Sequence, residues 1–261
     1  MLKNRRYGYL TPEIDGGQVQ MVKGQNIAGY PIGIIYIDEV FYPMLPGNVV
    51  NAYTYDFPVR MRAVEGLDVP DLFNMGESVY DHIMDACKKL EAEGVRAISS
   101  ACGFFGNYQD KVAEAMDIPV AISSLVQIPW IAALLKKNQK IGVITADASS
   151  LHPGTFESCG VSKELQKRLV IKDAKQTKEF NCVIEQRGYW DNTVAKQELV
   201  EKALEIVREF PDTGAILLEC SDMPPYASAI QAEVQLPVFD FITLIKWLHS
   251  SVCQKPYAGF I

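Results

Sequence analysis

Short apolar runs alternate along this chain with longer stretches in which apolar residues recur near helical spacing. Ala97–Ala101 and Ala215–Leu218 are short apolar runs, as expected for parallel strands that are buried on both faces. Met75–Glu93 and Gln197–Phe210 have helical spacing instead, and a glycine and a proline follow them directly, which favours helices that end there. Alternating strands and helices predict parallel sheets with right-handed crossovers.

The same order of elements occurs twice. A cysteine follows each buried run, and these residues, Cys102 and Cys220, are 118 positions apart (220 − 102). Prolines open the strand that comes next in each copy, and they keep the same offset. The opening strands IGIIYID, from Ile32, and IGVITAD, from Ile141, are 109 positions apart (141 − 32). We therefore predict two structural copies, each with an opening strand, a variable middle, a helix, a strand that ends in cysteine, a helix and a final strand.

These copies predict an α/β protein with two pseudo-symmetric domains, mainly parallel sheets, and an active site in the cleft between the domains. We assign residues 29–126 and 243–261 to the first domain, 127–242 to the second, and 1–28 to an extension outside the repeat. The helical stretch after the last strand of each copy can cross to the other domain. No linker rich in glycine and serine separates the halves, which favours a tightly coupled pair.

Composition narrows the function classes. The chain has 261 residues, of which 48% are hydrophobic and 22% charged, values typical of a soluble globular protein. Its net charge of -7 argues against a nucleic-acid partner. No apolar stretch reaches membrane-spanning length, and the N-terminal residues lack the apolar core of a signal peptide. We therefore expect a cytoplasmic protein without a membrane partner, whose six cysteines are reduced thiols.

The candidate chemistry centres on two of these thiols. No cysteines have CxxC spacing, the three histidines have no ligand-like neighbours, and no glycine-rich phosphate loop is present, so we expect neither a metal nor another cofactor. Free cysteine is most often a small buried hydrophobe, but Cys102 and Cys220 occupy equivalent positions at strand ends. Each precedes a turn into a predicted helix, whose N-terminus would lower the thiol pKa.

Two thiols that face each other across a cleft suit one reaction in particular. A thiolate removes a proton from a carbon next to a carboxylate, and the opposing thiol returns a proton to the other face. Such thiols start in opposite protonation states and titrate as a coupled pair. The predicted partner of the site is therefore a small carboxylate substrate.

Three motifs add a family resemblance: LECSDMPPY around the second cysteine, ACGFF around the first, and PMLPGNVVNAYTYDFPV after the first strand. They resemble the cofactor-independent aspartate/glutamate racemase superfamily, which includes hydantoin racemases, maleate isomerases and arylmalonate decarboxylases. The resemblance implies that Cys102 and Cys220 are the acid/base pair and that Ser221 binds a substrate carboxylate. Asp222 would orient the second site or contact a substrate amine, or else cap the helix ahead of two prolines.

The loops after the first strand of each copy, 36–51 and 145–150, are expected to line the cleft. We select four substrate-binding candidates from them: Tyr36, Asn51, Thr145 and Ser149. Tyr36 can alternatively be a packed strand aromatic, and Asn51 and Ser149 can serve ordinary turn and cap functions.

The chain departs from the family pattern after the first cysteine. Amino-acid racemases of the superfamily commonly have asparagine and threonine there, whereas this chain has Gly103 and Phe104. Glycine allows close backbone approach to an anion, and Phe104 would form an apolar wall or pack into the core. We count both among the substrate-binding candidates and expect a carboxylate substrate larger or more apolar than aspartate.

The main functional prediction is a cofactor-independent racemase or epimerase of an amino acid or a related small carboxylate. A maleate-isomerase type also uses two thiols, and an arylmalonate-decarboxylase type needs only one. A non-catalytic carboxylate-binding protein is a further alternative, in which neither thiol would be unusually reactive. Homodimers are common in the family, so a homodimer is one assembly that the resemblance implies.

Overall fold

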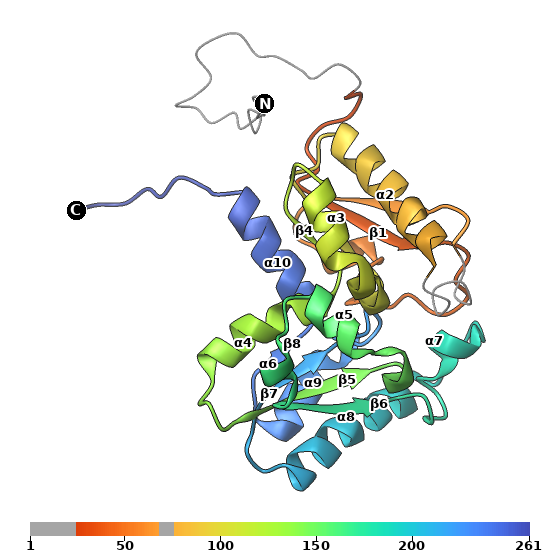
Figure 1. Cartoon of the computed structure of the whole chain (residues 1–261), viewed down its shortest axis with the longest axis vertical. Helices are drawn as coiled ribbons and strands as arrows, with labels where there is room; N and C mark the ends of the chain where they lie inside the picture. The colour runs from red at the N-terminus through yellow and green to blue at the C-terminus, as the bar shows by residue number, and fades with distance from the viewer. Residues whose placement is uncertain (1–24, 68–75) are drawn as a thin grey trace.

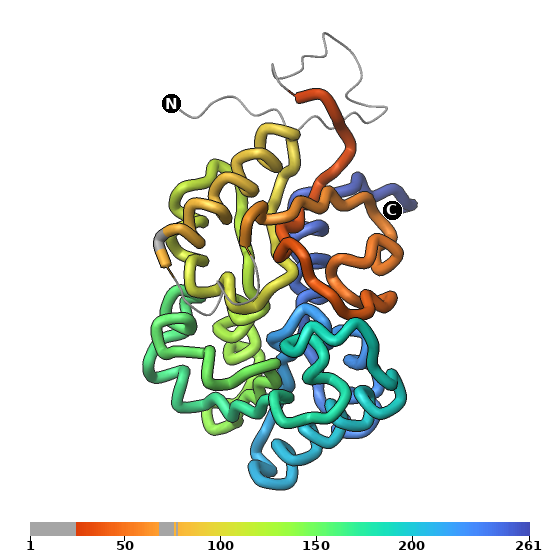
Figure 2. Tube along the Cα trace, turned by 90° about the vertical axis from the view of Figure 1, so that its right-hand side faces the viewer, coloured from red at the N-terminus to blue at the C-terminus, as the bar shows by residue number. Residues whose placement is uncertain are grey.

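The computed structural model describes residues 25–67 and 76–261. Most of the predicted extension 1–28, and Met75 at the start of the first predicted helix, therefore lie outside the described residues. The described chain forms two lobes, one above the other in Figure 1 and Figure 2, and each lobe contains one copy of the repeat.

Each lobe is built on a four-stranded parallel sheet. The first sheet has the order β2-β1-β3-β4, and its strands are β1 (Ile32–Ile37), β2 (Val59–Val64), β3 (Ala97–Ser100) and β4 (Val120–Ala121). The second has the order β6-β5-β7-β8, and its strands are β5 (Lys140–Thr145), β6 (Leu169–Asp173), β7 (Thr213–Leu218) and β8 (Val238–Phe239). The two orders are the same, which confirms the predicted two-copy α/β fold.

Strand register repeats as well. Ile32 pairs with Ala97 in the first sheet, and Ile141 pairs with Ala215 in the second. These pairs are related by the two offsets read from the sequence, 109 (141 − 32) and 118 (215 − 97). The offsets therefore described aligned backbone positions and not only similar motifs.

Helices connect the strands. The α-helices are α2 (Glu77–Ala92), α3 (Gln109–Ala115), α4 (Ile128–Leu134), α5 (Pro153–Ser158), α6 (Lys163–Gln166), α7 (Cys182–Glu185), α8 (Asn192–Glu209), α9 (Ala227–Val234) and α10 (Phe241–Val252). Short 3-10 turns are η1 (Ala52–Thr54), η2 (Gly103–Tyr108), η3 (Ser124–Gln127), η4 (Ala148–Ser150) and η5 (Pro224–Tyr226). Helix α8 begins five residues before the predicted Gln197 because the Asp191 carboxylate accepts hydrogen bonds from the N–H groups of Thr193 and Val194.

Glycines in the opening strands let the long helices pack closely on the sheets. A Cβ on Gly33 would lie 2.9 Å from Leu90 of α2, and a Cβ on Gly142 would lie 2.9 Å from Ile206 of α8. Such separations are below van der Waals contact, so each position requires glycine for this close approach.

The two lobes exchange helices. Helix α4 follows β4 but packs on β5 of the second sheet, and α10 follows β8 but packs on β1 and β3 of the first. Leu244 and Leu248 of α10 share a buried cluster with Ile32 and Ala97. A larger buried cluster contains residues of both sheets, including Ile98 and Val143. No helix within the described residues is long and apolar enough to cross a membrane.

Candidate active site

Both predicted cysteines lie at the carboxyl ends of central strands. Cys102 comes two residues after the end of β3, and Cys220 comes two residues after the end of β7. In each sheet the chain first adds a strand on one side of the opening strand and then adds the cysteine strand on its other side. Open α/β sheets bind ligands at this point, where the strand order reverses. A 3-10 turn follows each cysteine and leads into an α-helix, α3 after Cys102 and α9 after Cys220, which agrees with the predicted turn into a helix.

The two cysteine turns meet at the boundary between the lobes. The hydroxyl of Ser221, beside one cysteine, donates a 2.9 Å hydrogen bond to the carbonyl oxygen of Ala101, beside the other. Cys102 and Cys220 are 6% and 9% exposed, and they lie close enough that Cys102 raises the pKa of Cys220. The fold thus brings together the pair that the sequence singled out.

The expectation that these thiols have lowered pKa values is wrong for the substrate-free protein. Burial raises the pKa of Cys102, Glu219 raises it further, and the backbone N–H groups of Phe104 and Phe105 oppose the shift. The pKa of Cys220 is also raised, by burial and then by acidic neighbours. Desolvation and nearby carboxylates therefore outweigh the favourable backbone dipoles, and both thiols are protonated at neutral pH in the absence of substrate.

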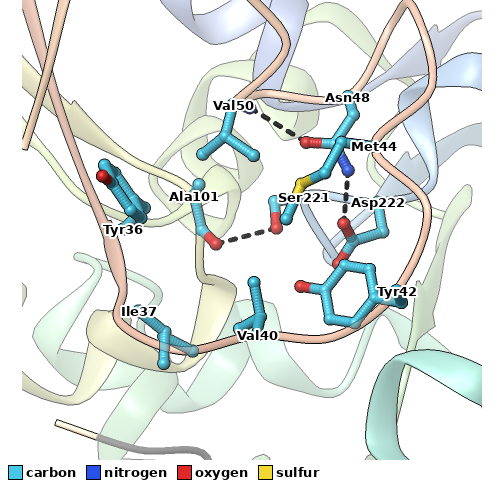
Figure 3. A pocket seen from close by; sticks show the side chains of 10 residues that line it. All are labelled: Tyr36, Ile37, Val40, Tyr42, Met44, Asn48, Val50, Ala101, Ser221 and Asp222. Atoms are coloured by element: carbon cyan, nitrogen blue, oxygen red, sulfur yellow. Dashed lines mark hydrogen bonds between the residues drawn. The ribbon is translucent and has the colours of Figure 1, made fainter. Parts of the chain in front are cut away.

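A small pocket lies at the bonded turns, and Ala101 and Ser221 are among the residues that line it (Figure 3). Its lining comes from the segment at and after β1 and from both cysteine turns. The residues are Tyr36, Ile37, Val40, Tyr42, Met44, Asn48, Val50, Ala101, Ser221 and Asp222. The thiols lie next to this lining, because Ala101 precedes Cys102 and Ser221 follows Cys220.

The loop between β1 and β2 closes over the Cys220 turn of the other lobe. The Asn48 side-chain amide donates a 2.5 Å hydrogen bond to the Asp222 carboxylate, and the Val49 N–H donates to the Ser221 carbonyl oxygen at 3.4 Å. The side-chain carbonyl of Asn48 in turn accepts from the Val50 N–H (Figure 3). This loop, predicted as residues 36–51, therefore forms one wall of the pocket.

The equivalent segment of the second lobe packs on the Cys102 turn. Ser158 of α5 donates a 2.7 Å hydrogen bond to Asp110 of α3, and Thr155 is hydrogen-bonded to Asn107 of η2. Each lobe thus supports the other lobe's cysteine turn, as a pseudo-twofold arrangement requires.

Asp222 is the acid closest to the second thiol. The Cys220 thiol donates to its carboxylate at 3.5 Å. Burial raises the pKa of Asp222 to about 6, although hydrogen bonds from Asn48, Cys220 and Tyr42 lower it. Its alternative role as a helix cap is not observed, because Met223 occupies the N-cap position of η5 and Tyr226 that of α9.

The remaining predicted site residues are either near the pocket or away from it. Tyr36 lines the pocket. Gly103 and Thr145 do not line it but lie against Glu219, to which the Thr145 hydroxyl donates a hydrogen bond. Phe104 is buried in the core cluster. Asn51 and Ser149 lie elsewhere, in the turn and cap roles that were their alternatives.

Hydrogen bonds define these last two positions. Asn51 caps η1 by accepting from the Tyr53 N–H and donates its amide to the Met44 carbonyl oxygen. Ser149 is bonded to Asp147 through its N–H and its hydroxyl. In the pocket wall, Asn48 occupies the place that was predicted for Asn51.

Comparison with known proteins places this site in a family. The family model described as Asp/Glu/Hydantoin racemase matches residues 58–248. The chain belongs to this racemase family. The matched segment includes both cysteine turns and β2 to β8, so it covers the larger part of both sheets.

Other comparisons add relatives and a solved fold. This racemase-family chain is 32% identical to dimethylsulfoniopropionate lyase 7 of Emiliania huxleyi, over 89% of the chain and 70% of that protein. It is 31% identical to a dimethylsulfoniopropionate lyase of Durusdinium sp. clade D, over 91% of the chain and 80% of that protein. The structure of allantoin racemase from Pseudomonas fluorescens superimposes with a TM-score of 0.57 at 16% identity, covering 85% of this chain and 90% of that one. That last similarity shows the shared fold.

Three neighbours of the thiols in this racemase-family site were not singled out from the sequence: Tyr42, Asn48 and Glu219. Tyr42 and Asn48 fall within the predicted loop 36–51, but nothing in their local pattern ranks them above the residues beside them. Glu219 carried a stronger signal, since it is an acidic residue at the end of the apolar run AILLEC, where an acid is rarely buried without a purpose.

Proposed function

We propose that this chain is a lyase that eliminates dimethyl sulfide from dimethylsulfoniopropionate or from a close sulfonium analogue. Two observations support the proposal. The chain is similar to two lyases of that substrate over about nine-tenths of its length, and an acidic side chain, Asp222, lines the pocket beside the thiol pair. The acidic pocket wall is the structural observation that carries the proposal.

The elimination begins with the step for which the paired thiols were predicted. A thiolate removes a proton from the carbon next to the substrate carboxylate. The electron pair of the broken C–H bond forms a carbon–carbon double bond, and the C–S bond breaks with its electron pair going to sulfur. Dimethyl sulfide leaves as a neutral molecule and acrylate remains, while the thiol holds the proton until it is lost to solvent.

The charge around the thiols suits a cationic group. Of the described residues that line the pocket, none is cationic and one, Asp222, is acidic. Glu219 lies below, close enough to raise the pKa of both thiols. A second substrate carboxylate, as in aspartate, would be repelled here, whereas a sulfonium would be attracted. A bound cation would also lower the pKa of the thiol next to it and so form the thiolate when substrate is present.

Aromatic rings and one neutral donor complete the proposed substrate site. Tyr36 and Tyr42 line the pocket, and tyrosine faces attract organic cations. Ser221 supplies a hydroxyl between the two turns, and we assign to it the substrate carboxylate, toward which the hydroxyl turns from the Ala101 carbonyl oxygen when substrate binds. Ser221 thus keeps the role that the family resemblance implied for it.

Racemisation is the second candidate, and the presence of both cysteines favours it. A racemase and this lyase share proton removal next to a carboxylate, and they differ in the fate of the resulting carbanion. Where the next carbon bears a good leaving group, the carbanion expels that group, and no carbanion remains for the opposing thiol to protonate. The predicted racemase chemistry and the proposed lyase chemistry therefore make different demands on the second thiol.

Proton NMR in heavy water distinguishes the two activities. The protein is incubated with dimethylsulfoniopropionate and, separately, with aspartate, glutamate and a hydantoin. The lyase proposal predicts the vinyl signals of acrylate together with loss of the sulfonium methyl signal. A racemase would instead exchange an α-proton for deuterium and reduce the optical purity of one of the other compounds.

A matched pair of inhibitors tests the charge argument in the same assay. The zwitterion 3-(trimethylammonio)propionate and its carbon analogue 4,4-dimethylpentanoate, which keeps the carboxylate and lacks the positive charge, have nearly the same shape. We expect the zwitterion to inhibit at least about tenfold more strongly, an advantage of about 1.4 kcal/mol, and Asp222→Asn to abolish the difference. No acrylate from any sulfonium carboxylate, or equal inhibition by the two compounds, would refute the proposal.

A further inference from the structure

Glu219 is a buried acid at the junction of the cysteine turns. None of the steps of the proposed elimination uses it. The residue is 1% exposed and precedes Cys220. Its Oε2 atom accepts a 2.8 Å hydrogen bond from the Thr145 hydroxyl. Its Oε1 atom is buried without a hydrogen-bond partner among the described residues. Because an unpaired buried carboxylate oxygen is costly, the groups that it faces are informative.

The free oxygen faces the cysteine turn of the other lobe. A Cβ built on Gly103, the residue after Cys102, would lie 1.7 Å from Glu219 Oε1 and 2.6 Å from the Glu219 carbonyl oxygen. The Ser124 hydroxyl, also from the first lobe, donates to that carbonyl oxygen at 3.3 Å. Glu219 therefore belongs to the second lobe in sequence, but its carboxyl group lies against the Cys102 turn, with one oxygen bonded to Thr145 and the main-chain carbonyl bonded to Ser124.

The two nearby carboxylates, Glu219 and Asp222, act unequally on the two thiols. Of the carboxylates near Cys102, Glu219 raises the thiol pKa most and Asp222 less, and at Cys220 this order is reversed. Glu219 also raises the pKa of Cys159. Burial raises the pKa of Glu219 itself to about 7, so this carboxyl group can hold or release a proton near neutral pH.

We propose that each thiol has its own acid, and that Glu219 is a positioning residue that exchanges a proton with Cys102 across the lobe boundary. In the exchange, the S–H bond of Cys102 breaks and an O–H bond forms on the Glu219 carboxylate. The pair keeps a single negative charge, so the buried site gains a thiolate without gaining charge. Cys220 instead stays protonated, and its S–H group donates a hydrogen bond to the Asp222 carboxylate.

The catalytic consequence is that Cys102 is the base of the elimination, and this consequence rests on the proposed function. The pairing of thiols with acids can be measured without turnover. Substrate-free protein is treated with methyl methanethiosulfonate, a small thiol reagent, between pH 6 and pH 10. Modification of Cys102 and of Cys220 is then followed separately by peptide mass spectrometry.

Two conservative variants, Glu219→Gln and Asp222→Asn, serve as controls for each other. Removing the Glu219 charge is expected to lower the pKa of Cys102 by at least about one unit, which makes its modification at least about tenfold faster at each pH, and to speed that of Cys220 by less. Asp222→Asn should give the opposite pattern. Should Glu219→Gln not fold, Thr145→Val shifts Cys102 in the same direction, because losing the Thr145 hydrogen bond keeps Glu219 protonated to higher pH.

The outcomes separate this inference from the proposed function. Equal shifts of both thiols in each variant, or an unshifted Cys102 in Glu219→Gln, would overturn the pairing even if acrylate forms. The expected crossed pattern in a protein that releases no dimethyl sulfide would leave the pairing intact and remove only the lyase assignment. A merely structural Glu219 would change the thermal midpoint without moving Cys102 relative to Cys220.

Discussion

The two cysteine turns occupy equivalent places in the two lobes, but the side chains beside their cysteines differ in charge. The first turn, residues 101–104, reads ACGF, and the second turn, residues 219–222, reads ECSD. Both follow the third strand of their sheet and both meet at the lobe boundary. The second turn carries two acids at the positions where the first has alanine and phenylalanine. Pseudo-symmetry thus supplies two thiols, and the side chains beside them make the thiols unequal.

This difference has a functional meaning. A racemase that works on both enantiomers needs two thiols that can exchange roles, whereas an elimination needs one base. Concentrating both acids in one turn favours a site with a cation and a division of labour between the thiols. Three sets of variants test whether the two turns are unequal in this way.

Replacing the thiols one at a time should have the largest and least symmetrical effect. We expect Cys102→Ser to lower kcat/KM for dimethyl sulfide release by about a thousandfold or more, because a hydroxyl is a much weaker acid than a thiol and cannot serve as the base. Cys220→Ser should cost about ten- to a hundredfold. Gas chromatography of dimethyl sulfide measures both rates.

Cys253→Ser is the matched control for these variants. Cys253 is a partly exposed cysteine that follows α10, so its replacement should leave the rate unchanged. Equal losses in Cys102→Ser and Cys220→Ser would contradict unequal roles and point to proton removal and return by the two thiols in turn. A larger loss in Cys220→Ser would assign the base to the second turn.

Adding one methyl group to the first turn and trimming the second should affect stability unequally. In Gly103→Ala the new Cβ would overlap Glu219 Oε1, so we expect a loss of about 3 kcal/mol in the free energy of unfolding. At the equivalent position, Ser221→Ala removes the hydrogen bond to Ala101 and adds no atom to the turn, so it should cost about 1 kcal/mol. Urea unfolding compares the two variants, and equal costs would mean that Glu219 does not lie against the first turn.

The smallest effect is a shift of pH dependence through Asn48. Its amide lowers the pKa of Asp222, so Asn48→Ala should raise that pKa above its present value of about 6. Under the proposed function sulfonium binding requires ionised Asp222, so activity should be lost as pH falls through this pKa. The acid limb of kcat/KM should therefore move to higher pH, by up to about one unit.

Asn51→Ala provides the control for this shift, since it changes the same residue type three positions away in the same loop. Asn51 bonds to Met44 and Tyr53 and not to Asp222. The variant should lose about 1 kcal/mol of stability as a cap is removed and leave the acid limb in place. An acid limb that moves equally in both variants would show that loop stability, and not Asp222, sets the pH dependence.

The repeat made most of the fold predictable. Offsets of 109 and 118 aligned both sheets residue by residue, because buried parallel strands must place the same kinds of side chain at matching register. Strands β2 and β6 were not predicted, since they lie in the variable middle of each copy. β2 (VRMRAV) alternates charged and apolar residues and is only partly buried, as is typical of an edge strand, so it lacks the continuous apolar run that revealed β3 and β7.

The candidate site was predictable only in part. Strand ends located Cys102 and Cys220, and the repeat raised them above the other cysteines. The thiol pKa values were misjudged because backbone dipoles are visible in a local pattern, whereas burial and a carboxylate from the opposite lobe are not. Asn51 was selected in place of Asn48 for a similar reason. The two asparagines are three positions apart in one loop, and only the contact of Asn48 with Asp222 of the other lobe distinguishes them.

The position of α10 sets the order in which the protein can be completed during synthesis. This helix is the last helix of the chain, yet it covers β1 and β3, which are made near the beginning. On the ribosome the first sheet emerges early and keeps one apolar face exposed until α10 has been translated. The first lobe is therefore begun before the second and completed after it.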